Sequence, residues 1–302
     1  MSDKPVILIL GAGGQVGTEL QRSFAEAGEV TTWDRKIADL SEAEVLRPLI
    51  RQLQPEIILN AAAYTAVDRA ETEPDLAMTI NGVAPRVLAE EAAKLDALLV
   101  HYSTDYVFDG SKKSPWVESD ATNSLNTYGR TKLAGERAIQ EVGGKHLVFR
   151  TSWVYGPHGH NFLRTMLRLG SERDELKIVD DQFGAPTSSL AIADATRAIV
   201  DTLKANAADY GVYHMTCGGE TTWRRFAEEI FAQHMWPDGR KAPQVIPISS
   251  SEYPTPAMRP ANSVLSNEKL QATFGIALPD WQSALSETMK VIASKDAAVA
   301  GI

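Results

Sequence analysis

A short apolar run that leads directly into a glycine-rich turn places the strongest constraint on how this chain can fold. Val6–Leu10 consists of aliphatic residues only, which is typical of a strand buried on both faces of a parallel sheet. A Gly-x-x-Gly-x-x-Gly turn follows, and helical spacing of apolar residues begins after it. Glycines in such a strand–turn–helix unit let the backbone approach a pyrophosphate closely. The pattern predicts a dinucleotide bound by Gly11, Gly14, Gln15, Val16 and Gly17.

The first half of the chain alternates short apolar runs with helical patterns. Further strands are predicted at Glu29–Trp33, Ile57–Leu59, Leu98–Ser103, Leu147–Phe149 and Val212–Met215. Strands that alternate with helices form right-handed βαβ units, so we predict an α/β fold with a doubly wound parallel sheet of the Rossmann type. Ligands of such sheets bind outside the carboxyl ends of the strands.

The pattern loosens after about residue 156, where segments that contain proline become common. We predict a dinucleotide-binding domain over residues 1–155, to which residues 187–218 return. Residues 156–186 and 219–302 are predicted to form a smaller, C-terminal substrate-binding lobe. A helix is expected to begin near Thr222 in that lobe.

Composition excludes several classes of function. The net charge of −9 argues against a nucleic-acid partner, because phosphate backbones are bound by basic faces. No apolar run approaches the ~20 residues that a bilayer-spanning helix needs, so no membrane partner is expected. The single Cys217 cannot form an internal disulfide, which fits a reducing compartment. We therefore expect a cytoplasmic protein.

Residues after the predicted second strand suit the adenosine end of a dinucleotide. Asp34 stands about twenty residues beyond the turn, where an acid accepts hydrogen bonds from the ribose hydroxyls. Arg35 could instead meet a 2′-phosphate, so NADH and NADPH both stay open. Asp39 and Leu40 offer a carboxylate and an apolar surface to the adenine, although an ordinary loop explains this pair equally well.

Tyr128 and Lys132 lie four positions apart and would share one face of a helix. An ammonium beside a phenol favours the phenolate, so we expect Lys132 to lower the pKa of Tyr128. Such a phenol could exchange a proton at neutral pH. The spacing is common by chance, and its weight comes from the nucleotide turn and from Ser103-Thr104-Asp105 at a strand end. There the Thr104 hydroxyl could stabilise charge on a substrate carbonyl oxygen.

These motifs, together with others spread over nearly the whole chain, resemble the extended short-chain dehydrogenase/reductase superfamily. Within it they resemble the dTDP-4-dehydrorhamnose reductase family most closely. The segments that carry the resemblance are Gly11–Gly17, Asn60–Asp68, His101–Phe108, Tyr128–Lys132, Phe149–Gly156, Asp181–Thr187 and Arg259–Ser263. The last three are more specific than the glycine turn, because a general superfamily member would not need them.

The resemblance implies an NAD(P)H-dependent reduction of dTDP-4-dehydro-β-L-rhamnose to dTDP-L-rhamnose. Tyr128 would be the proton donor, Lys132 its electrostatic partner and Thr104 the hydroxyl that tunes the carbonyl. Further cofactor contacts are implied for Ala63, Tyr64 and Thr65, and many relatives carry His at the position of Tyr64. The dTDP-sugar would meet Thr104, Asp105, Tyr128, Trp153, Gln182, Thr187 and Arg259. Core packing of Trp153 and a surface ion pair of Arg259 are the alternatives.

The resemblance also implies that some relatives dimerise around a Mg²⁺ held by glutamates. Glu19 fits one ligand position, but Leu190 and Val291 stand at the others, and aliphatic side chains cannot ligate a hard cation. We therefore expect no metal, and a monomer or weak homodimer. His158 and His160 lack an obvious third ligand and are interpreted as polar loop residues.

Two other functions stay open. One is a nucleotide-sugar epimerase or 4,6-dehydratase of the same superfamily, although dehydratases place an acidic pair after the catalytic Thr and this chain has only Asp105. The other is a non-catalytic subunit that resembles the regulatory subunit of methionine adenosyltransferase. The intact Tyr128, Lys132 and Trp153 favour the reductase.

Overall fold

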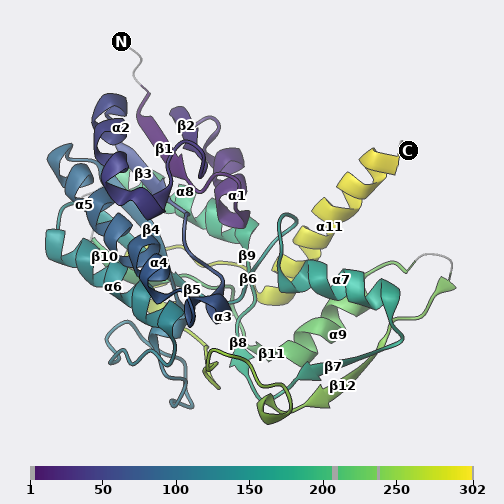
Figure 1. Cartoon of the computed structure of the whole chain (residues 1–302). Helices are drawn as coiled ribbons and strands as arrows, with labels where there is room; N and C mark the ends of the chain where they lie inside the picture. The colour runs from purple at the N-terminus through teal and green to yellow at the C-terminus, as the bar shows by residue number, and fades with distance from the viewer. Residues whose placement is uncertain (1–3, 206–209, 237–238, 301–302) are drawn as a thin grey trace.

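Parallel strands from the first 214 residues form the central sheet of the molecule (Figure 1). The structure, a computed structural model, describes residues 4–205, 210–236 and 239–300. Among these, six strands pair in the order β10-β5-β4-β3-β1-β2. They are β1 (Val6–Leu10), β2 (Glu29–Trp33), β3 (Ile57–Asn60), β4 (Leu98–Thr104), β5 (His146–Thr151) and β10 (Gly211–His214). The predicted doubly wound parallel sheet is confirmed.

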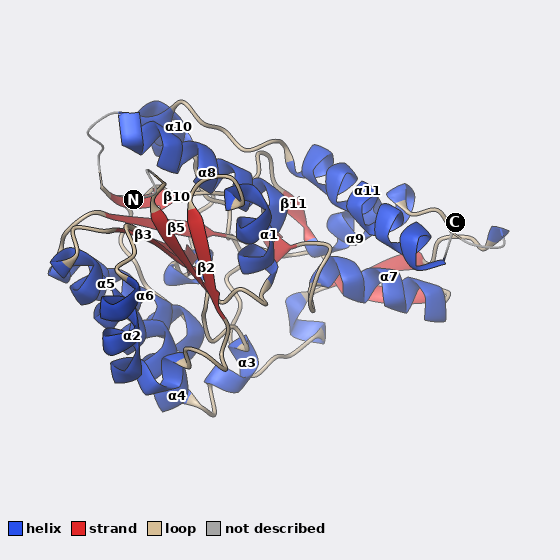
Figure 2. Cartoon of the chain, turned by 90° about the horizontal axis from the view of Figure 1, so that it is seen from above, coloured by secondary structure: helices blue, strands red, loops and turns tan. Residues whose placement is uncertain are grey.

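Alternate side chains of β1 enter two separate cores, because successive residues of a strand point to opposite faces. Ile7 and Ile9 lie in one buried cluster, and Leu8 and Leu10 lie in the other. Helices cover both faces of the sheet (Figure 2). One face carries α1 (Gln15–Phe24), α8 (Ser189–Ala205) and α10 (Glu268–Phe274), and the other carries α2 (Leu46–Leu53), α5 (Ala84–Lys94) and α6 (Thr127–Val142).

The helical segment that leads into α5 contains a widened turn. A short α4 (Pro74–Met78) passes into the π-helical η2 (Thr79–Val83) before α5 begins. Turns of this kind are rare and frequently lie at functional sites. Shorter helical turns are η1 (Leu40–Val45), α3 (Val67–Ala70), η3 (Asp105–Val107) and η5 (Ser250–Glu252).

The second lobe packs beside the carboxyl ends of the central strands (Figure 1). Its helices are α7 (Phe162–Glu172), α9 (Trp223–Gln233) and α11 (Trp281–Ala300). Its strand pairs are β7 (Glu175–Val179) with β12 (Gln244–Ile248), and β8 (Phe183–Gly184) with β11 (Thr221–Thr222). Thr222 caps α9, where the sequence predicts a helix start. The division into residues 1–155 with 187–218, and 156–186 with 219–302, is kept as a proposal.

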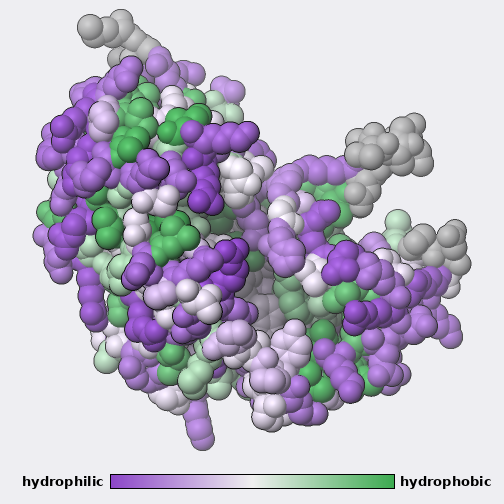
Figure 3. Space-filling view, viewed as in Figure 1, coloured by the Kyte–Doolittle hydropathy of each residue, from purple (hydrophilic) through white to green (hydrophobic). Residues whose placement is uncertain are grey.

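Two short strands, β6 (Val154–Tyr155) and β9 (Thr187–Ser188), pair where the chain passes between the two halves. The space-filling view is hollowed between the half that carries the central sheet and the half that carries α7 and α9 (Figure 3). Within the described parts of the chain, no helix combines the length and the apolar character needed to cross a membrane.

Candidate active site

The turn between β1 and α1 has the geometry of a nucleotide cradle. Gly11 has a φ of +74°, and a Cβ built on it would lie 2.6 Å from the backbone nitrogen of Ala62. Both observations require glycine there. Gly14 is the N-cap of α1, and the first N–H groups of a helix have no acceptor within that helix. The residues present therefore fit a dinucleotide pyrophosphate, which such N–H groups bind.

The acidic residue after β2 organises its own loop. Asp34 Oδ1 accepts hydrogen bonds from the backbone N–H groups of Lys36 (2.9 Å) and Ile37 (3.2 Å). Arg35 is 76% exposed and reaches Asp39, so its guanidinium lies at the same surface. Both features of the predicted adenosine site are therefore close together, and they keep NADH and NADPH open.

Asp39 and Leu40, which are neighbours in sequence, differ in their surroundings. Asp39 caps η1 by accepting hydrogen bonds from the backbone and the hydroxyl of Ser41, and these bonds lower the pKa of its carboxyl. Leu40 is only 6% exposed and belongs to the core beneath α2 and α5. The structure therefore assigns Leu40 mainly to packing, and little of its surface is left for an adenine.

The loop after β3, which carries Ala63, Tyr64 and Thr65, is held by one buried side chain from the π-helical turn. Asn81 Oδ1 accepts from the backbone N–H of Tyr64 (2.8 Å), and its Nδ2 donates to the carbonyl of the same residue (3.0 Å). Asn81 Nδ2 also donates to the hydroxyl of Thr131 on α6 (3.1 Å). One amide thus connects the predicted cofactor loop to the helix that carries Tyr128 and Lys132.

The predicted catalytic hydroxyls meet at the carboxyl end of β4. Thr104 Oγ1 donates to Asp105 Oδ1 (2.8 Å), and a hydrogen bond also links Thr104 with the Tyr128 phenol. The rings of Tyr106 and Tyr128 pack edge to face with their centroids 5.8 Å apart. The half-buried Tyr128 therefore lies beside Thr104 and Asp105, as the sequence predicts, and we call the surroundings of these three side chains the crevice.

The expected effect of Lys132 on Tyr128 is wrong for this structure. Burial raises the pKa of the Tyr128 phenol, the charge of Asp105 raises it further, and the hydrogen bond with Thr104 opposes both. Lys132 is buried, and its Nζ hydrogen-bonds the carbonyl of Tyr102 (2.6 Å) and Nε2 of His101 (3.1 Å). Burial lowers the pKa of Lys132 to about 8, against the opposing charge of Glu136. The side chain is engaged with β4, which helix spacing alone could not reveal.

Asp105 is a buried acid surrounded by hydroxyl groups. Burial raises the pKa of its carboxyl to about 6, although hydrogen bonds from Ser263, Thr104 and Ser152 stabilise the ionised form. Its Oδ2 accepts from the Ser152 hydroxyl at 3.3 Å. A carboxyl with such a pKa changes charge close to neutral pH, which marks a candidate functional group.

Trp153 occupies a strained position between the two halves of the molecule. Its φ of +47° is unusual for a bulky residue, and such strain is often retained where a side chain has a function. Its indole stacks on Trp223 of α9 with ring centroids 3.5 Å apart. On Gly184 a Cβ would lie 2.4 Å from the Trp153 ring, so that position requires glycine. The stack fixes Trp153 at the lobe boundary.

Gln182 and Thr187, both predicted to bind the nucleotide diphosphate, are placed differently. Gln182 Oε1 accepts from the Trp223 indole N–H (3.1 Å), and its Nε2 donates to Ser250 (2.9 Å). Thr187 is fully buried, and its hydroxyl donates to the carbonyl of Ala185 (3.0 Å). The structure does not bring Thr187 to an accessible surface, so we remove it from the candidate site.

Arg259 reaches back to the first half of the chain. Its Nη2 donates to Asp68 Oδ2 (2.9 Å) and its Nη1 to the carbonyl of Ala257 (2.9 Å). Burial and the charge of Asp105 raise the pKa of Tyr106, and the charge of Arg259 opposes them. Arg259 therefore lies near Tyr106, whose ring packs against Tyr128.

Comparison with known proteins finds relatives over nearly the whole chain. The family model described as "RmlD substrate binding domain" matches residues 5–294. A dTDP-4-dehydrorhamnose reductase from Burkholderia thailandensis is 50% identical, and the match covers 96% of this chain and 99% of that protein. The chain belongs to the dTDP-4-dehydrorhamnose reductase family. The Escherichia coli K12 member is 46% identical over 91% of this chain and 94% of its own length.

A solved structure extends the likeness to the fold. The dTDP-4-dehydrorhamnose reductase of Bacillus anthracis, in complex with NADP, has a TM-score of 0.87 and 34% sequence identity. The match covers 95% of this chain and 99% of that one. In this reductase family the cofactor is NADH or NADPH, and the glycine turn described above is the part of this chain that fits it.

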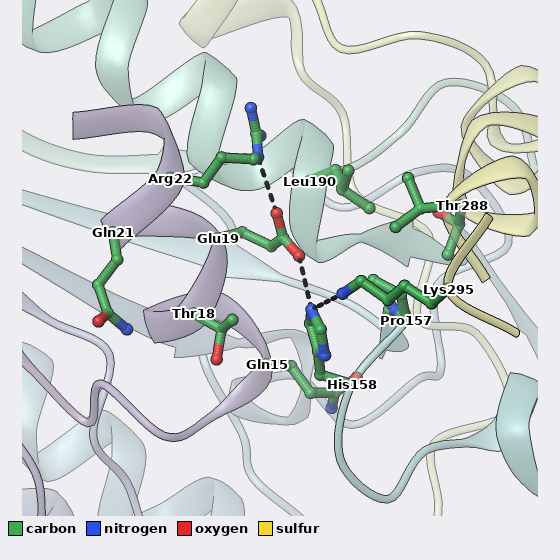
Figure 4. Close-up of polar contacts among 12 residues, drawn as sticks. Gln15, Thr18, Glu19, Gln21, Arg22, Pro157, His158, Leu190, Thr288 and Lys295 are labelled. Carbon is green, nitrogen blue, oxygen red and sulfur yellow. Dashed lines mark hydrogen bonds and ion pairs between the residues drawn. The ribbon is translucent and has the colours of Figure 1, made fainter. Parts of the chain in front are cut away.

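Glu19, which the sequence analysis considers as a possible metal ligand, has other partners here (Figure 4). Glu19 is 3% exposed; its Oε2 accepts from Arg22 Nε (2.9 Å), and its Oε1 lies 3.5 Å from His158 Nε2. Lys295 Nζ lies 2.8 Å from the same His158 nitrogen, and Leu190 adds only an aliphatic side chain. Among the described residues, no group of three or more His, Cys, Asp or Glu side chains could hold a metal. These residues do not fit a Mg²⁺ site.

Three side chains of the candidate site could not be found by sequence reasoning. Asn81 and Trp223 act on the predicted residues through tertiary contacts, and no motif marks either of them. His101 does stand three positions before Thr104 on the same strand, within a segment that carries the family resemblance. That position alone gave no indication of its contact with Lys132.

Proposed function

We propose that this chain reduces dTDP-4-dehydro-β-L-rhamnose to dTDP-L-rhamnose, with Tyr128 as the proton donor. As a member of its family, the chain is an NAD(P)H-dependent oxidoreductase. The observation that carries the assignment of roles is the convergence of Tyr128, Thr104 and Asp105 at the carboxyl end of β4. That position is where ligands of doubly wound sheets bind.

The reduction adds one hydride and one proton to a ketone. When bound, the reduced nicotinamide supplies the hydride for the keto carbon. Tyr128 gives its proton to the keto oxygen, and the raised pKa of its phenol means that the group is protonated at neutral pH before the ligands bind. The Thr104 hydroxyl can turn its proton from Asp105 to the same oxygen and stabilise the charge that develops there. We assign Lys132, one helical turn from Tyr128, to the nicotinamide ribose.

The remaining candidates are assigned to the two ligands. The dinucleotide is held by the glycine turn and by Asp34, Ala63, Tyr64 and Thr65, with Asp39 as a further polar contact. Trp153 and Asp105 line the deoxysugar pocket, whereas Gln182 and Arg259 approach the thymidine diphosphate. Arg259 suits this role because a guanidinium can bind a phosphate through two parallel hydrogen bonds.

Replacement of Tyr128 by Phe tests the assignment. The variant Tyr128→Phe removes only the reactive oxygen, so it should retain NADPH binding. General acid catalysis contributes roughly a hundred- to ten-thousandfold, and the variant should lose turnover by a factor in that range. Oxidation of NADH or NADPH on addition of the keto-sugar measures both the rate and the cofactor preference. A rate near that of the unaltered enzyme would end the proposal.

The same assay separates the rivals. An epimerase or dehydratase regenerates its dinucleotide in each cycle, so it would convert the sugar without net NAD(P)H oxidation. A regulatory subunit would bind the dinucleotide and leave the sugar unchanged. One NAD(P)H consumed for each sugar reduced is the result expected for the reductase.

We further propose a monomer or weak homodimer that acts in the cytoplasm without a bridging metal. The cationic partners of Glu19 and the single cysteine support this proposal. The mass in solution, measured by light scattering, should be the same with Mg²⁺ and with a chelator. A dimer that dissociates on chelation would contradict it.

A further inference from the structure

Both faces of the Trp153 indole are covered by other residues. On one face the Trp223 indole of α9 lies nearly parallel, with 8° between the ring planes and 3.5 Å between the ring centroids. At that separation the two rings are in van der Waals contact, and no third ring fits between them. The other face meets the backbone of β8 at Gly184.

The contacts of Gly184 show that it lies over the face of the Trp153 ring and not at its edge. A Cβ built on Gly184 would lie 2.4 Å from Cε2 of Trp153, and 2.7 Å from both Cζ2 and Nε1, the atoms bonded to Cε2. A point at the edge of the ring would be closer to these two outer atoms than to Cε2. The three atoms nearest to this Cβ all belong to Trp153, so it does not lie in the gap between the two indoles. Gly184 therefore covers the face opposite to Trp223.

Trp223 is itself held in place by contacts in the second lobe. Its Nε1 donates to Gln182 Oε1 (3.1 Å), and this hydrogen bond fixes the rotation of the ring. Its ring also packs against Phe162 of α7, with ring centroids 4.7 Å apart. Phe162 packs in turn against Phe226, a fully buried residue of α9. The support beneath Trp153 is therefore continuous with the core of the second lobe.

The edge of the half-buried Trp153 indole carries an unused hydrogen-bond donor. Within the described residues, Trp153 Nε1 has no acceptor, whereas the indoles of Trp223 and Trp236 each donate to an oxygen. A buried indole N–H usually has such a partner. Trp153 directly follows Ser152, whose hydroxyl donates to Asp105 in the crevice (3.3 Å). Trp153 therefore brings a free donor to the neighbourhood of the crevice.

We propose that Trp223 is a positioning residue for the sugar, which holds the Trp153 indole against Gly184 so that Trp153 offers the substrate its N–H edge and not its face. The proposal rests on the proposed place of Trp153 in the deoxysugar pocket. An indole N–H can only donate, and a sugar oxygen can accept from it. Because the direction of this donor is fixed before the ligand arrives, little entropy is lost on binding. Stacking of the sugar on this indole is excluded, since both faces are occupied.

The expected effect is confined to the sugar part of the ligand. The loss of one hydrogen bond lowers affinity by roughly two- to tenfold. Because dTDP lacks the sugar, its affinity should not depend on Trp223. The ratio of the affinities for dTDP-L-rhamnose and for dTDP therefore isolates the contribution of the sugar, and it can be measured by calorimetry without turnover.

The free donor can be observed directly in the unaltered protein saturated with NADP⁺. In ¹⁵N-labelled protein each indole N–H gives its own signal, and Trp153→Phe identifies that of Trp153. Addition of dTDP-L-rhamnose should move this signal downfield, because the N–H gains an acceptor, and dTDP alone should not produce this shift. If dTDP-L-rhamnose binds and the Trp153 signal does not move, the proposal is overturned while the proposed function stands. Binding of neither ligand would refute the proposed function, and this proposal with it.

Two substitutions disturb the Trp153 indole from opposite faces. Trp223→Leu removes the flat support, and Gly184→Ala places a methyl group where the Trp153 ring lies. Each should lower the affinity for dTDP-L-rhamnose by roughly two- to tenfold relative to the affinity for dTDP, with NADP⁺ bound. Trp223→Phe restores an aromatic face and should recover part of the loss.

Trp236→Leu is the matched control. Trp236 follows α9, donates its indole N–H to the Phe231 carbonyl (3.2 Å) and packs against the rings of Phe231 and His234. Its substitution should lower the thermal stability without changing the ratio of the two affinities. If folded Trp223→Leu and Gly184→Ala kept the ratio of the unaltered protein, Trp223 would have a structural role only, and the proposal would be refuted.

Discussion

Two buried carboxyl groups, Asp105 in the crevice and Glu91 on α5, have different hydrogen-bond partners and opposite pKa shifts. Glu91 is completely buried, and its oxygens accept from Arg51 (2.6 Å) and Lys94 (2.8 Å) among other cations. These hydrogen bonds lower the pKa of Glu91 to about 2. Asp105 is 4% exposed and is surrounded by the hydroxyls of neighbouring residues, and burial raises its pKa to about 6.

The difference shows how the molecule treats charge in its scaffold and in its crevice. In the scaffold, cations compensate the burial of Glu91, so its ionised form stabilises the packing of α2 against α5. In the crevice, the groups around Asp105 donate hydrogen bonds but carry no charge, so its ionised form is only partly compensated. An acid left in that condition is costly for stability and is typical of a site that works on a ligand.

The largest expected effect is on activity, in the crevice. Asp105→Asn keeps the shape of the side chain and removes the charge that the Thr104 and Ser152 hydroxyls face. Hydrogen bonds to charged groups contribute about 1.5–3 kcal/mol, so kcat/KM should fall roughly 10- to 100-fold. Urea unfolding should show stability unchanged or raised at pH 7. An Asp105→Asn variant with normal activity and lowered stability would show that Asp105 has a structural role, as Glu91 has, and would contradict the proposed difference.

The next effect is on stability, in the scaffold. Glu91→Gln should lower the free energy of unfolding by about 1–2 kcal/mol, because a charged acceptor is lost while its partners are partly exposed to water. The matched control is Glu90→Gln on the same helix, which loses a single partly exposed contact with Arg47 and should cost below about 1 kcal/mol. Both variants should retain kcat/KM. Equal costs for the two would mean that the burial of Glu91 is unimportant.

The smallest expected effect is on the pH dependence of stability, which should be opposite for Glu91 and Asp105. Because the pKa of Glu91 is lowered, its contribution is complete above pH 4.5, its ordinary pKa, and is lost as the pH falls toward 2. The stability gap between the unaltered protein and Glu91→Gln should therefore narrow from pH 5 to pH 3. Because the pKa of Asp105 is raised from 3.8 to about 6, its ionisation destabilises the folded state as the pH rises across that interval.

The free energy of unfolding of Asp105→Asn should therefore rise relative to that of the unaltered protein between pH 4 and pH 6, by an amount on the order of 1 kcal/mol. Urea unfolding at several pH values measures both trends. The stability of the unaltered protein is compared with that of Glu91→Gln and with that of Asp105→Asn. If both differences changed in the same direction with pH, the two carboxyl groups would share one kind of environment.

Much of the fold could be predicted because its signals are local. The limits of β1 and β2 agree with those read from the apolar runs, and the glycine turn lies where the spacing places it. The helical segment from Pro74 to Lys94 is interrupted by the π-helical turn at Thr79–Val83. That turn places Asn81 between the cofactor loop and α6, and such a tertiary contact leaves no periodic signal in the sequence.

The sequence by itself determined the sheet, the nucleotide turn and the presence of Tyr128 and Lys132 on one helical face, because each depends on residues close together in the chain. Only the tertiary structure decided what Lys132 contacts, since His101 and Tyr102 come from β4 and burial depends on every element packed around them. For the same reason the pKa of Tyr128 is raised, contrary to the expectation from the spacing of two residues. Local patterns fix which groups are present, and the desolvation and hydrogen bonds that set their charge arise only when distant segments meet.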